Sequence, residues 1–141
     1  MSGREGETRR WLRYAGEDLR VAHQLAASPE AFPRHSCFMA QQAAEKALKA
    51  ALILAGIEIP FTHDLDKLRN LLPADWRTPT ACPDLSALTI WAVEARYPGD
   101  LPEVVEADAW EALRNADAVY QAVKADLQAH GLGEQEPSAA D

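Results

Sequence analysis

Residues 34–56, RHSCFMAQQAAEKALKAALILAG, decide the fold of this chain. On a helical wheel at about 100° per residue, apolar side chains fill more than half of the circumference. The polar strip that remains is narrow and consists of Gln42, Glu45, Lys46 and Lys49. Pro33 suits the first turn of such a helix, and Gly56 suits its C-terminal cap. The pattern therefore predicts a helix that is either the centre of a bundle or also faces a second subunit.

The rest of the chain shows the same helical periodicity and no strand-like alternation. Four further helices are predicted, over 8–27, from Thr62 or Asp64 to Leu72, over 84–95 and over 102–129. We therefore expect an all-α fold, an antiparallel four-helix up-and-down bundle with one additional short helix, formed by residues 8–129. Residues 130–141 are small and acidic, and we expect them to form a disordered tail.

The formal net charge of −8 argues against a broad nucleic-acid surface, although it leaves room for a local basic pocket. Arginines and glutamates alternate near the N-terminus, which is interpreted as mixed rather than basic: Arg4, Glu5, Glu7, Arg9, Arg10, Arg13 and Glu17. No secretory leader and no run of about 18 apolar residues is found, so we expect a cytoplasmic protein without a membrane partner. Cys37 and Cys82 are expected to be free thiols, with a disulfide as the alternative.

Several short motifs occur in one order along the chain. Trp11 and Asp18-Leu19 come first, followed by QQAAEKALK at 41–49, THDL at 62–65 and ARYP at 95–98. In this order and spacing the chain resembles the HEPN domain family from Trp11 to about Val123. The resemblance implies a helical bundle that commonly forms homodimers.

The same resemblance implies a function. HEPN proteins are often encoded beside a minimal nucleotidyltransferase, with which they form a two-component module of toxin–antitoxin type, and a nucleotide-binding role has been proposed for them. We therefore expect a HEPN subunit that homodimerises, pairs with a minimal nucleotidyltransferase and contributes to nucleotide binding.

A ribonuclease is the alternative function. Some branches of the family are metal-independent ribonucleases, in which a histidine follows an arginine after four to six residues. Here no histidine follows Arg96 at that spacing, and Met39 stands where many close relatives carry a histidine. An atypical site would have to combine Arg96, Tyr97 and His63. A non-catalytic role is therefore favoured.

The candidate ligand-binding residues are Asp18, Gln41, Lys46, Lys49, His63, Arg96 and Tyr97. Gln41 projects into the apolar face, where an unpaired amide would cost roughly 1–3 kcal/mol. It belongs either to a hydrogen-bond network inside the bundle or to a ligand site. Asp18 needs a partner, and Arg96 is the expected one. Arg96 either clamps Asp18 or holds a phosphate or carboxylate beside Tyr97.

Lys46 and Lys49 have carboxylate or amide neighbours four residues away, an arrangement typical of a solvated helix face. Alternatively they line an anion site that reaches toward His63. His63 either joins the cap network of the following helix or titrates in a pocket. No histidine pair has metal-ligand spacing, and no phosphate loop or nucleophile motif is present, so we expect no metal, no cofactor and no catalytic residue.

Overall fold

Three long helices and several short ones make up the part of the chain that the computed structural model describes, residues 3–92 and 103–133. The long helices are α1 (Gly3–Ala27), α2 (Pro33–Leu54) and α6 (Glu106–Ala129). The short ones are α3 (Leu65–Asn70), α4 (Thr78–Ala81), α5 (Ser86–Thr89) and a 3-10 turn at Ile90–Ala92. Every regular element in these ranges is helical, which confirms the prediction of an all-α fold.

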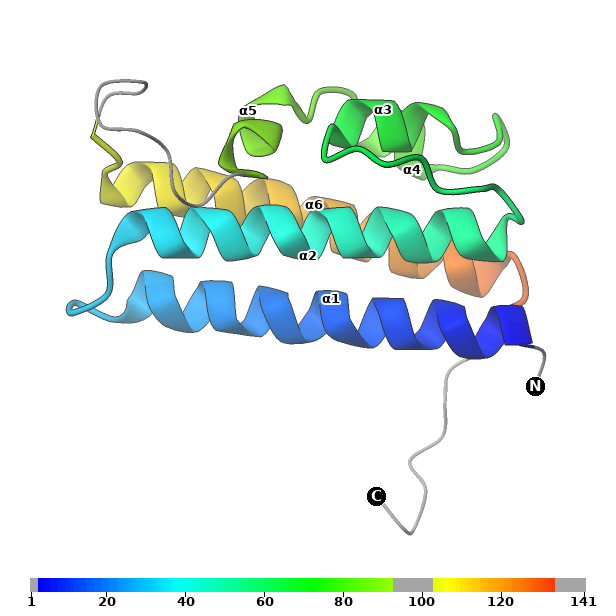
Figure 1. Ribbon diagram of the computed structural model, residues 1–141, viewed down its shortest axis with the longest axis horizontal. Coiled ribbons are helices and arrows are strands. Elements are labelled where there is room, and N and C mark those ends of the chain that lie inside the picture. Colours follow the sequence, from blue (N-terminus) through cyan, green and yellow to red (C-terminus); the bar gives the residue numbers. More distant parts are fainter. Residues whose placement is uncertain (1–2, 93–102, 134–141) are drawn as a thin grey trace, which may run out of the picture.

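The helices keep an up-and-down order, as Figure 1 shows. α1 runs antiparallel to α2, and α6 runs in the same direction as α2. Between α2 and α6 the chain returns through α3, α4 and α5, which lie on the side of α2 opposite α1. The third leg of the bundle is thus a row of short helices.

This third leg differs from the single helix expected over 84–95. Its regular structure in this range is limited to α5 and the 3-10 turn, and residues 93–95 lie outside the described ranges. Serine, threonine and isoleucine have only moderate helix propensity, and short hydroxyl side chains bond competing backbone groups. Asp84 Oδ1, for example, accepts hydrogen bonds from the Ser86 backbone N–H (3.0 Å) and the Ser86 hydroxyl (2.6 Å), which form a local turn before α5.

α2 is the central helix of the bundle, which was one of the two alternatives. No residue from Ser36 to Leu52 is exposed, because α1, α6 and the third leg cover α2 on all sides. Many of its buried positions are alanines with no accessible surface, namely Ala40, Ala43, Ala44, Ala47, Ala50 and Ala51. Small side chains allow helices to approach closely, so the alanines place α2 deep in the bundle.

The helix ends follow local capping rules. α1 ends at Ala27, just before Ser28-Pro29, as predicted. The Asp64 side chain accepts a 3.2 Å hydrogen bond from the Lys67 backbone N–H and caps α3. α6 begins at Glu106 rather than near residue 102. At this start, Asp108 accepts a 2.9 Å hydrogen bond from the Val105 backbone N–H.

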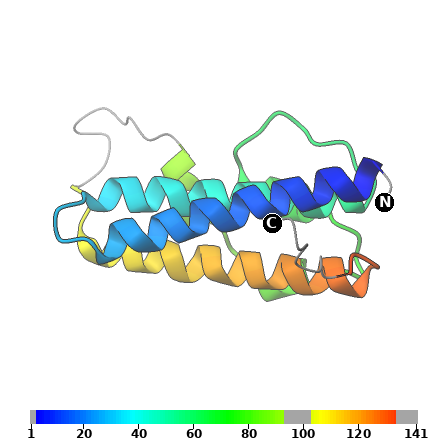
Figure 2. The same ribbon diagram turned by 90° about the horizontal axis from the view of Figure 1, so that it is seen from below.

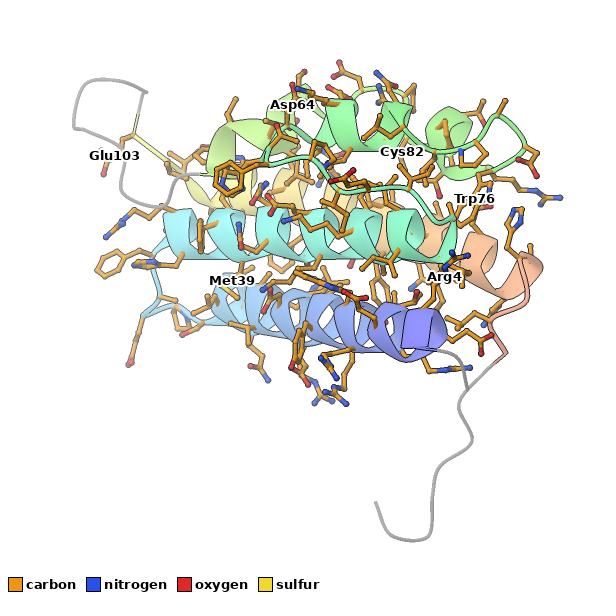
Figure 3. The ribbon with its side chains drawn as sticks, turned by 45° about the vertical axis from the view of Figure 1, so that its right-hand side comes forward. Arg4, Met39, Asp64, Trp76, Cys82 and Glu103 are labelled. Atoms are coloured by element: carbon orange, nitrogen blue, oxygen red, sulfur yellow. The ribbon has the colours of Figure 1, made fainter. Side chains whose placement is uncertain are left out.

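Asp126 of α6 fixes the third leg to the long helices. Its carboxylate is 2% exposed and accepts bonds from the backbone N–H of Arg77 (2.9 Å), the backbone N–H of Thr78 (2.8 Å) and the Thr78 hydroxyl (2.6 Å). Trp76, labelled in Figure 3, stacks on His130 with ring centroids 4.4 Å apart. The bonds to Asp126 cap α4 with a side chain from α6, and the stacked rings add a second contact between the third leg and the end of α6.

Both cysteines are buried free thiols. Burial, followed by the nearby negative charges of Asp108 and Glu111, raises the pKa of Cys37 to about 12. Burial also raises the pKa of Cys82, which lies in the third leg (Figure 3). The thiolate is the reactive form of cysteine, so burial disfavours the reactive form of both groups in the folded chain.

The C-terminal part of the described chain still packs on the bundle. α6 ends at Ala129, and Leu132 is only 4% exposed. Residues 134–141, which belong to the expected tail, lie outside the described residues. No helix within the described ranges is long and apolar enough to cross a membrane.

Gly56 provides a test of the chain reversal after α2. Its φ of +76° lies in the left-handed region, and the Arg4 guanidinium would lie 3.2 Å from an added Cβ. We expect Gly56→Ala to lower the free energy of unfolding by about 1–2 kcal/mol, mainly because of the backbone conformation. Chemical denaturation measures this change.

Gly6→Ala is the matched control. Gly6 lies inside α1 with open space around an added Cβ, so alanine should raise stability by up to about 1 kcal/mol. Equal effects of the two substitutions would contradict this account of Gly56.

Candidate functional site

Polar side chains of α2 gather around Glu45 inside the protein. Glu45 is 4% exposed. Its Oε2 accepts a 2.8 Å bond from Lys49 Nζ, and its Oε1 lies 2.8 Å from His63 Nδ1 and 3.1 Å from Gln41 Nε2. We call Gln41, Glu45, Lys49 and His63 the Glu45 cluster. The Glu45–Lys49 pair was predicted from its spacing, but its assignment to a solvated face is wrong because the segment carrying His63 covers it.

The charge of Glu45 is stabilised by these partners. Burial by itself would raise its pKa, yet the hydrogen bonds from Lys49, His63 and Gln41 and the charge of Lys49 outweigh burial and hold the pKa below its ordinary value. A buried carboxylate with such partners remains ionised. Glu45 therefore keeps its negative charge, paired with Lys49, between α2 and the segment that precedes α3.

The amide of Gln41 is fully bonded within the protein. Gln41 has no accessible surface, and its Nε2 also lies 3.4 Å from the His63 carbonyl oxygen. Its Oε1 accepts a 2.7 Å bond from Gln42 Nε2. This geometry agrees with the internal network that was one of the alternatives for Gln41, and ligand contact stays a prediction.

α1 closes the other side of the polar strip. Lys46 Nζ forms an ion pair with Asp18 Oδ2, and the two side chains are 27% and 17% exposed. Lys49 Nζ lies 5.6 Å from the centre of the Trp11 ring, within the range of a cation–π contact. Asp18 thus pairs with Lys46, whereas Arg96, its expected partner, lies outside the described residues.

His63 and Phe61 form the accessible edge of the cluster. The His63 side chain is 56% exposed, and Nδ1 is the ring nitrogen that faces Glu45. The Phe61 side chain is fully exposed, and its ring centroid lies 6.4 Å from that of His63. Asp64, which follows His63, marks this edge at the start of α3 in Figure 3. A ligand that contacts the cluster would first meet these two rings.

The structure therefore brings most of the predicted site residues to one strip of α2. Gln41, Lys49 and His63 meet at Glu45, and Asp18 with Lys46 forms the adjoining pair. Arg96 and Tyr97 lie outside the described residues, so their part in the site stays a prediction.

Three contributors were missing from the predicted site, namely Trp11, Glu45 and Phe61. The four-residue spacing of Gln41, Glu45 and Lys49 was the available signal for Glu45. Nothing comparable identified Phe61. Among the described residues, no group of three or more histidines, cysteines or acids is placed to hold a metal ion.

Glu45 should make the free energy of unfolding depend on pH in the acidic range. Its folded-state pKa lies below the ordinary value of 4.5, so its stabilising effect is complete above that value and is lost as the pH falls through the folded-state pKa. We expect Glu45→Gln to cost about 1–3 kcal/mol at pH 7 and to flatten the decline of stability in acid. Urea denaturation at a series of pH values measures both effects.

Glu17→Gln serves as the control, because Glu17 is 63% exposed and lies 3.9 Å from Arg13. It should change stability by less than about 0.5 kcal/mol and leave the pH profile intact. If the stability of Glu45→Gln changed with pH in parallel with that of the wild type, the Glu45 cluster would not be stabilising the ionised form of Glu45.

Known proteins are similar to this chain in sequence and architecture. The sequence matches the HEPN domain over residues 8–126. The crystal structure of TT1696 from Thermus thermophilus is similar at 28% identity and a TM-score of 0.71, over 86% of this chain and 98% of that one. ST0689, an archaeal HEPN homologue, is similar at 28% identity and a TM-score of 0.64, over 84% and 96%. No curated protein matches. The extent of the domain match shows that the chain belongs to the HEPN domain family.

Proposed function

We propose that this chain is a HEPN subunit that homodimerises and pairs with a minimal nucleotidyltransferase in a toxin–antitoxin-like module. We further propose that its Glu45 cluster contributes to nucleotide binding. Membership of the HEPN family supports the choice of partners.

The observation that carries the nucleotide role is the exposed Phe61 ring beside a cluster whose charges are already paired. Glu45 and Lys49 neutralise each other, and Lys46 neutralises Asp18. Such a site has a fixed shape and little net charge, which suits the binding of a nucleotide base. An exposed aromatic ring offers a stacking surface for a base, and the half-exposed His63 ring adds a polar edge.

Nucleotide binding at this edge has a direct test. We expect calorimetry with ATP to detect modest binding that Phe61→Ala weakens at least about fivefold, because a stacked base contributes roughly 1–3 kcal/mol. Phe32→Ala is the matched control, since Phe32 is also an exposed aromatic ring, 66% accessible, but precedes α2 at its other end. Absence of heat with both ATP and GTP would reject the nucleotide role.

The partner proposal is tested separately. Size-exclusion chromatography with light scattering should give twice the chain mass of 15.5 kDa at micromolar concentration. A minimal nucleotidyltransferase encoded beside this chain should co-purify with it when the two are co-expressed. A clean monomer would overturn the homodimer, and failure to co-purify would overturn the pairing.

A second function is supported by one observation. The contact between His63 and the buried Glu45 leaves the other ring nitrogen of His63 available as a proton donor or acceptor, as general acid–base catalysis requires. An atypical ribonuclease would combine His63 with Arg96 and Tyr97. RNA incubated with wild type, His63→Gln and Arg96→Ala decides the matter. Equal cleavage by all three, or none by any, eliminates the ribonuclease.

A further inference from the structure

A groove of about 550 Å³ lies between α1 and α6, away from the Glu45 cluster. Its volume falls within the range of roughly 300–1,000 Å³ that is usual for small-molecule sites. Four cationic residues line it, Arg9, Arg10 and Arg13 from α1 and Lys124 from α6. Figure 2 shows that α1 and α6 diverge toward the N-terminus of α1, which is the end where these residues lie.

The groove is basic although the chain carries a net charge of −8. No acidic residue of the described chain lines it. Arg13 meets Glu17 at 3.9 Å, but both side chains are more than 60% exposed, and such pairs contribute little. Neither Arg10 nor Lys124 forms an ion pair within residues 3–92 and 103–133. The positive charge of the groove is therefore largely uncompensated by the described protein.

Arg9 adds an unused hydrogen-bond donor. One of its terminal nitrogens donates a 2.6 Å bond to the Gly133 carbonyl oxygen. Its Nε is buried and is the one buried side-chain nitrogen or oxygen in the described chain without a hydrogen-bond partner. A buried donor without a partner costs free energy, which a bound acceptor would recover.

The placement of these arginines is unfavourable for the helix itself. Arg9 and Arg13 are neighbours on the surface of α1 at a four-residue separation, where two like charges repel each other. A bound anion would remove this penalty. Leu12 and Leu127 line the groove beside the charges and give it an apolar wall.

We propose that the α1–α6 groove binds a small anion with two or more linked phosphate groups. Guanidinium groups bind phosphate oxygens through paired N–H donors, and Lys124 supplies a point charge from the facing helix. The groove spans residues of two helices, which suits a chain of phosphates rather than a single one. This site is independent of the proposed function, because Trp11 and Asp18 contact α2 while the groove arginines face α6.

Calorimetry with sodium tripolyphosphate at a physiological ionic strength of about 0.15 M tests the proposal. We expect the wild-type chain to bind it, and the double variant Arg10→Gln with Lys124→Gln to bind at least about tenfold more weakly, since charge-assisted hydrogen bonds are the strong ones. Both side chains are exposed, so the fold should be preserved, which circular dichroism verifies. Phe61→Ala should leave tripolyphosphate binding unchanged, so that this site and the nucleotide site fail or succeed separately.

The matched control is Arg20→Gln with Arg34→Gln, which removes the same charge from exposed positions outside the groove. Its affinity should stay within about twofold of the wild type, because distant exposed charges are screened. Equal loss in both double variants would overturn the proposal, as would binding of inorganic phosphate as tight as that of tripolyphosphate. Binding of tripolyphosphate that appears only after Glu134 and Glu136 are replaced by glutamine would also overturn the proposal, because the chain's own acidic segment would then be the ligand of the groove.

Discussion

The complete covering of α2 is the constraint on which the rest of this structure depends. A helix with no exposed residue from Ser36 to Leu52 must either be apolar there or pair each polar group internally. Its alanines meet the first condition and allow close packing on several sides. Glu45 meets the second condition through Lys49, His63 and Gln41. The candidate site is therefore a consequence of where α2 lies.

This origin explains why the Glu45 cluster and the adjoining Asp18–Lys46 pair join separate parts of the chain. His63 comes from the segment before α3, and Asp18 comes from α1. His63 meets Glu45, which has almost no access to bulk water, and Asp18 meets the partly exposed Lys46. The cluster fixes the position of the chain before α3, and that segment in turn presents Phe61 to solvent. The fold and the proposed nucleotide role thus depend on the same hydrogen bonds.

The sequence was sufficient to locate the long helices, although it did not predict that the helix expected over 84–95 is reduced to α5 and a 3-10 turn. Periodicity and Gly56 located α2, and spacing identified the Glu45–Lys49 pair. Burial of that pair was not predictable, because it depends on how the chain after Gly56 folds back over α2. The interleaved glutamates concealed the basic groove for the same reason, since only the packing of α1 on α6 adds Lys124 to the arginines. Burial of a side chain and the composition of a groove depend on contacts between helices, which the pattern within one helix does not reveal.

The capping of α4 by Asp126 has a consequence for the order in which the chain folds. A helix of four residues cannot offset its own nucleation cost, so α4 persists only while α6 supplies the carboxylate. We expect the third leg to assemble late and to open first, while the three long helices stay packed. Amide hydrogen exchange at Arg77 and Thr78 reports on this, and protection there equal to that in α2 would contradict it. On this expectation, the bundle consists of three long helices that stay packed and a third leg that opens more readily.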